Sequence, residues 1–258
     1  MPEVVFEARD LGLTLPAADG PREILAHVDF TLAAGEILTI VGASGTGKTS
    51  LLRILAGLAA PSRGALTYRG KPVDGPQDGV AIVFQDYGNA LLQWRSVARN
   101  VALGIERQFK GEALRSRVTE ALQLVGLERN ANDYPWQLSG GMQQRVQIAR
   151  AIAMRPAVLL MDEPFGALDA MTKATQQDEL LRLREATGAS VIFITHDIEE
   201  AIYLGDRVAL LSGSPGAITH RFEVGLPFPR EQVTTREMPR FVDLRHELHE
   251  AIRATGGH

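Results

Sequence analysis

Short, almost wholly apolar runs recur along the chain, and each of them predicts a buried strand. They occupy residues 35–42, 79–84, 157–162, 190–196 and 207–213. A run of this length that is bounded by glycine or charged residues is typical of a strand covered on both faces of a parallel sheet. We therefore expect a mainly parallel sheet at the centre of the fold.

Apolar residues at helical spacing follow the first of these runs and recur between the second and the third. Residues 48–58 carry leucines at helical spacing and a glycine near the end, which predicts a helix after the first run. Between 84 and 157 the strand signal stops, and Leu114, Val118 and Leu122 recur at helical spacing. A helical insertion is therefore expected to divide an α/β core.

The two ends of the chain differ in texture from this core. Val4, Phe6 and Ala8 alternate with polar residues, so the first 34 residues predict strands of a more antiparallel sheet. After about Leu226 the proline-containing stretch LPFPR reads as a linker. Apolar residues then return at helical spacing, which predicts a last amphipathic helix over about 241–252.

These patterns divide the chain into an α/β domain and a C-terminal extension. The domain covers residues 1–225, with a core formed by 1–85 and 157–225 and a helical subdomain at 86–156. The extension, residues 226–258, holds the linker and the last helix. The sequence contains no internal repeat that would suggest another arrangement.

Composition narrows the class of protein only a little. The chain is 45% apolar and 22% charged, as is ordinary for a globular protein, and its net charge of -4 argues weakly against a nucleic-acid footprint. It has no cysteine, which excludes disulfides and thiolate chemistry. Its first residues lack the pattern of a signal peptide, and no run of about 18 apolar residues occurs, so we expect a cytosolic chain that does not span a membrane.

A glycine-rich loop follows the first predicted strand and opens the first predicted helix. It matches the phosphate-binding P-loop, in which backbone N–H groups and a helix N-terminus wrap a triphosphate. Lys48 would reach the β- and γ-phosphates, and the Thr49 hydroxyl would ligate Mg²⁺. The residues expected to bind ATP are Gly42, Ala43, Ser44, Gly45, Thr46, Gly47, Lys48, Thr49 and Ser50.

Polar residues at the ends of the other predicted strands complete the candidate site. Asp162 ends an apolar strand and would lie beside Mg²⁺, while Glu163 would polarise the attacking water. His196 would contact the γ-phosphate, and Gln85 would ligate Mg²⁺ or orient water, because ligands bind at the carboxyl ends of strands in open α/β sheets. Without the P-loop, each of these residues would read equally as an ordinary strand end.

A second glycine turn, LSGGM at 138–142, opens another predicted helix. Ser139 can be an ordinary N-cap. Capping does not explain Gly140 and Gly141, because glycine in the first turn lowers helix stability. Capping alone therefore leaves the two glycines of this turn unexplained.

These motifs, in this order, resemble the ATP-binding subunit of an ABC transporter over nearly the whole chain. The stretch VFQDYGNALLQW, the GALDA run and the PFPR-plus-helix tail are similar to the nitrate, sulfonate and taurine importers. The resemblance implies a P-loop NTPase core with an N-terminal antiparallel β subdomain and an inserted helical subdomain. It also implies family roles, which are the Q-loop glutamine for Gln85, the signature for 138–142, the Walker B aspartate for Asp162, the catalytic glutamate for Glu163, the D-loop aspartate for Asp169 and the switch histidine for His196.

Assembly is implied by the same resemblance. Subunits of this family pair head to tail around two ATPs, so the signature of one chain would close on the γ-phosphate held by the other. Transmembrane permease subunits would dock near residues 86–100, where Tyr87, Leu91, Leu92 and Trp94 either flank a groove or pack in a core. The implied setting is the cytoplasmic face of a bacterial inner membrane, with a solute-binding protein as indirect partner and no nucleic acid.

Two other functions stay open, and three residues depart from the family pattern. The alternatives are a non-transport ABC ATPase that acts on nucleic acid or ribosomes, and a P-loop kinase for a small acceptor. Met142 stands where glutamine is commoner in the signature, and Gln93 where the importer group often has proline. Leu15 stands where the family stacks an aromatic ring on adenine, which leaves the selectivity for the base unexplained.

Overall fold

The computed structural model describes residues 3–84, 90–166 and 168–255, and it contains two β-sheets. The smaller sheet is antiparallel, with strand order β2-β1-β4-β5. Its strands are β1 (Val4–Leu15), β2 (Arg22–Ala33), β4 (Arg63–Tyr68) and β5 (Lys71–Pro72). The antiparallel strands predicted in the first 34 residues are confirmed, and β4 and β5 extend the sheet beyond them.

The larger sheet has six strands in the order β10-β9-β3-β8-β7-β6, and all neighbouring pairs are parallel except β10 with β9. Its strands are β3 (Ile37–Val41), β6 (Val80–Val83), β7 (Val158–Asp162), β8 (Ser190–Thr195), β9 (Arg207–Ser212) and β10 (Ala217–Glu223). All five predicted strands are confirmed. The sequence pattern did not predict β10, an antiparallel edge strand with mostly exposed polar residues.

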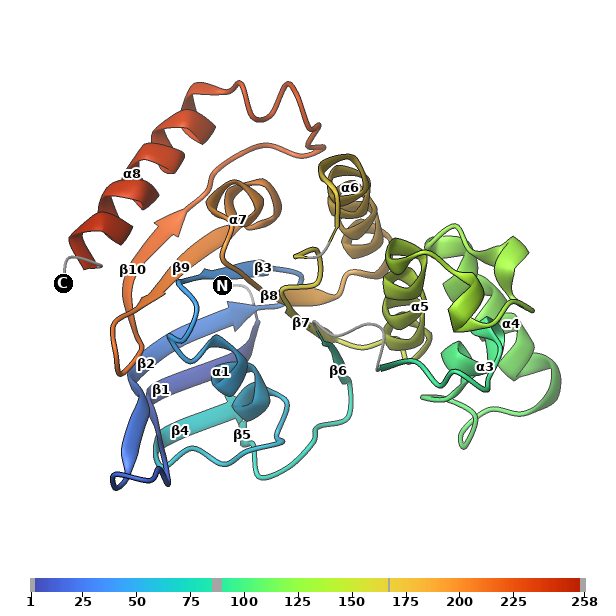
Figure 1. Ribbon diagram of the computed structural model, residues 1–258, viewed down its shortest axis with the longest axis horizontal. Helices are drawn as coiled ribbons and strands as arrows, with labels where there is room; N and C mark the ends of the chain where they lie inside the picture. Colours follow the sequence, from blue (N-terminus) through green and yellow to red (C-terminus); the bar gives the residue numbers. More distant parts are fainter. Residues whose placement is uncertain (1–2, 85–89, 167, 256–258) are drawn as a thin grey trace.

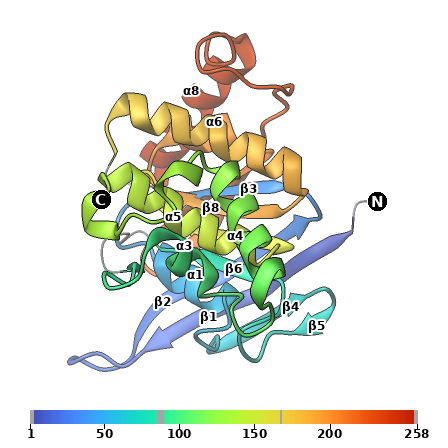
Figure 2. The ribbon, with the colours of Figure 1, turned by 90° about the vertical axis from the view of Figure 1, so that its right-hand side faces the viewer.

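Helices cover the large sheet and extend beyond one end of it. They are α1 (Lys48–Leu55), α3 (Val97–Ala102), α4 (Gly111–Leu124), α5 (Gly140–Ala153), α6 (Ala170–Thr187), α7 (Ile198–Leu204) and α8 (Pro239–Thr255), with short 3-10 turns at Glu128–Asn130 and Pro135–Gln137. Figures 1 and 2 show α3, α4 and α5 gathered on the β6 side, and α8 near β9 and β10 at the opposite side. The predicted helical insertion and C-terminal helix are confirmed.

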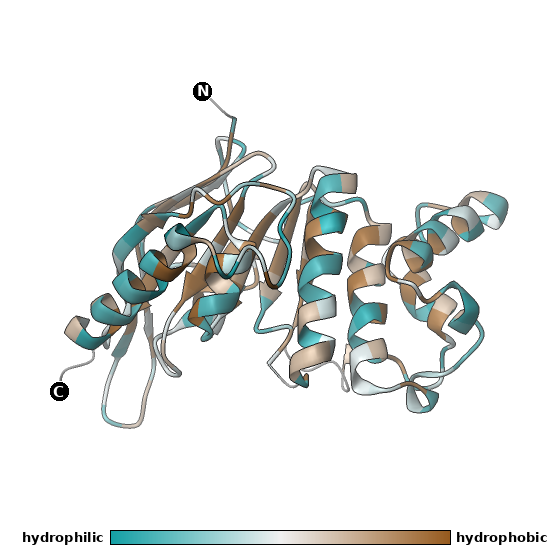
Figure 3. Cartoon of the chain, turned by 90° about the horizontal axis from the view of Figure 1, so that it is seen from above, coloured by the Kyte–Doolittle hydropathy of each residue, from teal (hydrophilic) through white to brown (hydrophobic). Residues whose placement is uncertain are grey.

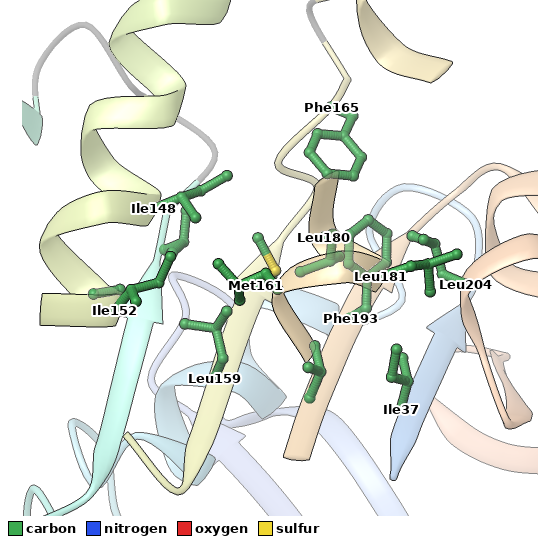
Figure 4. Close-up of a cluster of buried hydrophobic side chains, with 14 of the residues drawn as sticks. Ile37, Ile148, Ile152, Leu159, Met161, Phe165, Leu180, Leu181, Phe193 and Leu204 are labelled. Carbon is green, nitrogen blue, oxygen red and sulfur yellow. The ribbon is translucent and has the colours of Figure 1, made fainter. Parts of the chain in front are cut away.

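The large sheet is buried on both faces, which explains why its strands are apolar at consecutive positions. On β8, Val191 and Phe193 belong to one buried cluster, whereas Ile192 and Ile194 belong to another. The first cluster packs under α5, α6 and α7, and Figure 4 shows Leu159 and Met161 of β7 within it. The second cluster joins the two sheets around α1.

Hydrophilic residues lie among hydrophobic ones along most helices, as Figure 3 shows. Helices α4 and α8 bury one side only, whereas no residue of α5 or α7 is exposed. Among the helices that the structure describes, none combines the length and apolar character needed to cross a membrane.

The strand order brings three loops to one edge of the sheet. Strands β3, β8 and β7 are neighbours and run parallel, so their carboxyl ends lie side by side. Val41 pairs with Thr195, and Asp162 pairs with Ile194, in the register of these strands. The P-loop, Glu163 and His196 therefore leave the sheet at adjacent points.

Candidate functional site

The glycines of the P-loop allow a close fit between this loop and the rest of the core. A Cβ atom at Gly42 would lie 2.3 Å from the carbonyl oxygen of Leu211, so only glycine fits there. Gly47 has φ of +91°, and a Cβ on it would lie 2.7 Å from the side chain of Leu25. The loop thus rests against β2 and β9 and leads directly into the N-terminus of α1.

Lys48 is folded back onto its own loop. Its side chain is 6% exposed, and its ammonium group donates to the carbonyl oxygens of Gly42 (2.8 Å) and Ala43 (3.0 Å). The same nitrogen lies 3.2 Å from Oε1 of Glu163. The P-loop cation and the candidate base are therefore already in contact.

Glu163 is held from two sides. Its Oε2 atom lies 2.8 Å from Nδ1 of His196, and its backbone φ of +41° turns it out of the line of β7. Burial acts to raise the pKa of this carboxyl, but hydrogen bonds from His196 and Lys48 outweigh it and lower the pKa below its usual value. Glu163 is therefore a carboxylate at neutral pH.

Asp162 has the opposite electrostatics. It is 4% exposed, and burial raises the pKa of its carboxyl despite a hydrogen bond with Thr49. Two neighbouring carboxyls are thus shifted in opposite directions, a pattern typical of functional sites.

The oxygens of Asp162 and Thr49 fit a magnesium ion. Mg²⁺ prefers hard oxygen donors and binds through one or two protein groups together with substrate phosphates. Over residues 3–84, 90–166 and 168–255, no group of three or more His, Asp or Glu side chains is placed to hold a metal by itself. Thr49 and Asp162 would supply two oxygens to Mg²⁺, and water or phosphate oxygens would complete its coordination.

A shallow opening at the carboxyl ends of the strands makes Lys48, Thr49 and Glu163 accessible to a ligand. Its lining includes Lys48 and Glu163 together with an apolar residue of β2, and the full set is Ile24, Ser44, Gly45, Gly47, Lys48, Thr49, Ser50 and Glu163. Sequence reasoning missed Ile24, because nothing in its local pattern marks it. Leu15, the expected adenine neighbour, is 42% exposed at the end of β1 and does not line this opening.

His196 is 57% exposed at its side chain, so its ring remains accessible beside Glu163. The structure therefore brings together Lys48, Glu163 and His196 from three separate loops, and Asp162 with Thr49 beside them. Gln85, the candidate for sensing Mg²⁺ and the γ-phosphate, lies outside the described residues, as does Tyr87.

The signature Ser139 is the N-cap of α5, and its hydroxyl accepts from the backbone N–H of Met142 at 3.4 Å. Gly141 is buried, and a Cβ on it would lie 3.1 Å from the methyl group of Thr172. Packing between α5 and α6 is thus one reason for glycine at this position, besides the phosphate contact that the resemblance implies. Met142 is partly buried against the hydrophobic core.

Asp169 caps the next helix. Its Oδ1 accepts from the backbone N–H groups of Met171 (3.1 Å) and Thr172 (3.0 Å), and its Oδ2 accepts from the Thr172 hydroxyl. The bond from the Thr172 hydroxyl, followed by the bonds from the backbone, lowers the pKa of this exposed carboxyl. Ser139 and Asp169 are both exposed, and neither lines the opening around Lys48. The P-loop cluster and the signature are therefore separate surfaces of one chain.

The candidate docking residues divide into two kinds. Leu91 is 3% exposed and belongs to the hydrophobic core, whereas Trp94 is 75% exposed. Core packing explains Leu91, and Leu92 is half-buried. Among Leu91, Leu92 and Trp94, the candidates that the structure describes, Trp94 is the most exposed.

The family model described as ABC transporter matches residues 25–166 of the chain. The nitrate import ATP-binding protein NrtD of Synechococcus elongatus is 41% identical, with 92% of this chain and 87% of that protein covered. The taurine import ATP-binding protein TauB of Pseudomonas entomophila is also 41% identical, with 95% of each chain covered. The nitrate import ATP-binding protein NrtC of S. elongatus is 42% identical over 87% of this chain, but the chain spans only 34% of its length.

Solved structures show the same fold. The ATP-binding cassette MJ0796, solved as a dimer in a post-hydrolysis state with ADP and Pi, matches with a TM-score of 0.75 and 31% identity over 85% of this chain and 98% of that one. The cbiO1 protein from Clostridium perfringens, part of the ABC transporter complex cbiONQ, gives a TM-score of 0.78 and 27% identity over 96% of this chain and 99% of that one. The group of relatives and the fold both agree with the resemblance stated from the sequence.

Proposed function

The chain belongs to the ABC transporter family of ATP-binding proteins, and on this premise we propose that it hydrolyses ATP to power an ABC importer. The observation that carries the proposal is the contact of Glu163 with both Lys48 and His196 above the P-loop. A non-catalytic nucleotide-binding module needs the loop but has no use for a carboxylate held at this point.

Binding of ATP changes the partners of Lys48 in this proposal. Its ammonium group leaves the carbonyl oxygens of its own loop and takes up the β- and γ-phosphates. Glu163 then loses the Lys48 ammonium, one of the two hydrogen-bond partners that lower its pKa, and gains a negative neighbour. Both changes make the carboxylate more basic. The nucleotide thus prepares the base that acts on it.

Glu163 then orients and polarises one water molecule. The water oxygen bonds to the γ-phosphorus, the bond to the oxygen bridging to the β-phosphorus breaks, and the water proton passes to the carboxylate. His196 keeps the carboxylate in place through Nδ1 and presents its other face to the γ-phosphate. Gln85 completes this set as a water-orienting or Mg²⁺-binding residue.

Mg²⁺ would be held by Thr49 and Asp162, and also by Gln85 in the family role. When bound, it would neutralise charge on the β- and γ-phosphates. The buried Asp162 carboxylate would gain a cation beside it, which reverses the cost of its burial.

The proposed working unit is a head-to-tail dimer, a homodimer or a pair with a similar ATPase subunit. Ser139, Gly140 and Gly141 of one chain then meet the γ-phosphate on the P-loop of the other, and Asp169 lies at the same interface. The exposure of both Ser139 and Asp169 on the isolated chain supports this arrangement.

The proposed cargo is a small anionic solute of the class named by the relatives, such as nitrate, a sulfonate or taurine. Permease subunits bind the helical subdomain through Trp94, and a solute-binding protein delivers the cargo to them. The chain would then work at the cytoplasmic face of a bacterial inner membrane.

Co-purification from detergent-solubilised membranes tests the transport role. The tagged chain should retain multi-span membrane proteins, and Trp94→Ala should release them. Trp136→Ala is the matched control, since Trp136 is also exposed, at 68% against 75% for Trp94. Recovery of ribosomes or DNA in place of membrane proteins would instead support the non-transport alternative.

A further inference from the structure

Helix α7 follows His196, and side chains of the C-terminal segment, residues 226–255, contact this helix at both of its ends. Helix α7 begins two residues after His196, and Asp197 between them is its N-cap. One residue, Asp197, thus separates His196 from α7, so the position of this helix bears directly on that of His196. Figure 1 shows α8 and the chain leading to it passing over α7 and α6.

In the first turn of α7, two arginines of the C-terminal segment share one carboxylate. Arg236 Nη1 lies 2.8 Å from Oε2 of Glu199, and Arg245 Nη1 lies 3.1 Å from Oε1. Both oxygens of Glu199 are thus engaged from outside the helix. Arg236 also donates to Oε1 of Gln177 on α6 at 3.2 Å.

At the last turn of α7, Arg230 closes the other end. Its side chain is 7% exposed, and Nη1 donates to the carbonyl oxygens of Tyr203 (2.7 Å) and Gly205 (2.9 Å). A guanidinium at a helix C-terminus satisfies carbonyl groups that the helix itself leaves unpaired.

Helix α6 is tied into the same arrangement. Gln232 donates to Ala174 (3.0 Å) and Asp178 (2.8 Å), both on α6. Lys173, one turn after the Asp169 cap, lies 2.6 Å from Asp197 and so joins α6 back to the start of α7. The two helices that follow Asp169 and His196 are therefore braced by one external segment.

We propose that Arg236 and Arg245, acting through Glu199, are positioning residues that keep His196 against Glu163 and thereby set the rate of ATP hydrolysis. The inference rests on the proposed function, in which His196 faces the γ-phosphate. Without the ion pairs to Glu199, the start of α7 keeps its contacts with Lys173 and Gln177 of α6 but loses those with the C-terminal segment. The paired arrangement of His196 and Glu163 then becomes less populated. Fewer molecules are then competent at any moment, while the P-loop that binds ATP is unchanged.

Glu199→Gln tests this with little change in shape, and Glu247→Gln is its matched control. Both glutamates pair with arginine and are similarly exposed, at 42% and 46%, but Glu247 pairs with Arg240 within α8 and makes no ion pair to α7 in the part of the chain that the structure describes. In the 258-residue chain, Glu199→Gln should lower kcat on the order of three- to tenfold with KM for ATP within about twofold. Glu247→Gln should change neither constant, and both variants should share one thermal midpoint.

A second readout follows His196 directly. The imidazole nitrogen resonances of His196 in the nucleotide-free chain should shift in Glu199→Gln and stay in place in Glu247→Gln. Unchanged resonances, or an unchanged kcat, in Glu199→Gln would overturn the inference. If the unaltered chain hydrolyses no ATP, the proposed function fails instead, and the resonances still decide whether the C-terminal segment positions His196.

Discussion

At the scale of single residues, the site depends on two adjacent carboxyls with different surroundings. Glu163 is paired with Lys48 and His196, which keeps it ionised, whereas burial makes ionisation of Asp162 costly. Glu163 is suited to hold a water molecule, and Asp162 gains most from a cation beside it. Each difference can be measured separately.

Removing the charge of Glu163 tests its role as base. Glu163→Gln should bind ATP but hydrolyse it about 10²–10⁴ times more slowly, the usual contribution of a general base. With hydrolysis blocked, an ATP-bound dimer should accumulate and appear as an earlier peak in gel filtration. Hydrolysis at a near-normal rate would remove Glu163 from the mechanism.

Asp162 should limit the stability of the nucleotide-free chain. Because burial raises its pKa in the folded state, ionisation costs folding free energy above that pKa, and the cost disappears as pH falls below the unfolded value of about 3.9. Asp162→Asn should therefore raise the thermal midpoint at pH 7, and this gain should vanish in acid. A gain of ~1 kcal/mol in the free energy of unfolding would raise the midpoint by about 2–4 °C in a chain of this size.

The same variant should lose the extra stabilisation that Mg²⁺ and ATP give to the unaltered chain, since a ligand stabilises only the state that binds it. Thermal scans with and without both ligands would show this. A midpoint at pH 7 below that of the unaltered chain would contradict the assignment of Asp162 as a destabilising buried charge.

At the scale of elements, the crossing of α5 and α6 explains part of the signature. Gly141 faces Thr172 across the two helices, and a Cβ would approach the Thr172 methyl to 3.1 Å. Contacts this short force a neighbour to move. The glycine therefore sets how closely the signature helix can approach the helix capped by Asp169.

Gly141→Ala should lower both the thermal midpoint and ATPase activity. Thr172→Ser removes the crowding methyl but keeps the hydroxyl that bonds Asp169, so the double variant should recover both. Thermal scans and steady-state assays of the two single variants and the double variant give the comparison. Recovery of stability without activity would show that the backbone at Gly141 serves a ligand and that packing is secondary.

The same scale shows which elements the sequence could predict. Buried parallel strands have a strong apolar signal, so β3 and β7 and the residues at their ends were predictable. Helix α6 was missed because Gln176 and Gln177 occupy buried positions where apolar residues would mark a helix. Edge strand β10 was missed because only one of its residues, Ile218, is buried.

The candidate site likewise contains residues that the sequence could predict and residues that only the tertiary structure reveals. Motif spacing predicted Lys48, Glu163 and His196, since strand order brings parallel strand ends together. The contacts of Arg236 and Arg245 with Glu199 join residues with no shared pattern, so only the tertiary structure reveals them. Ile24 enters the opening by its place in β2, which local sequence does not encode.

At the scale of the whole molecule, the P-loop and the signature turn lie on separate surfaces of the chain. Lys48 lies in the opening at the strand ends, whereas Ser139 caps α5 and does not line that opening. In a two-fold dimer the two sites are equivalent, and each draws on both chains. The central claim is that the signature of one chain acts on the ATP of its partner.

Mixing two inactive variants tests that claim most directly. Lys48→Ala removes a phosphate contact from the chain's own loop, and Ser139→Arg places a bulky side chain where the partner's γ-phosphate should sit, so each homodimer should be inactive. In a mixed dimer one site carries both lesions and the other carries none. Random pairing makes about half the dimers mixed, so about a quarter of the sites should be whole.

ATPase activity should therefore reappear on mixing, up to about a quarter of that of the unaltered protein. Each variant alone, at the same total concentration, is the control. If each signature served its own chain, every site in the mixture would carry one lesion. Activity that stays at the level of the separate variants, in a mixture shown to contain mixed dimers, would contradict the shared site.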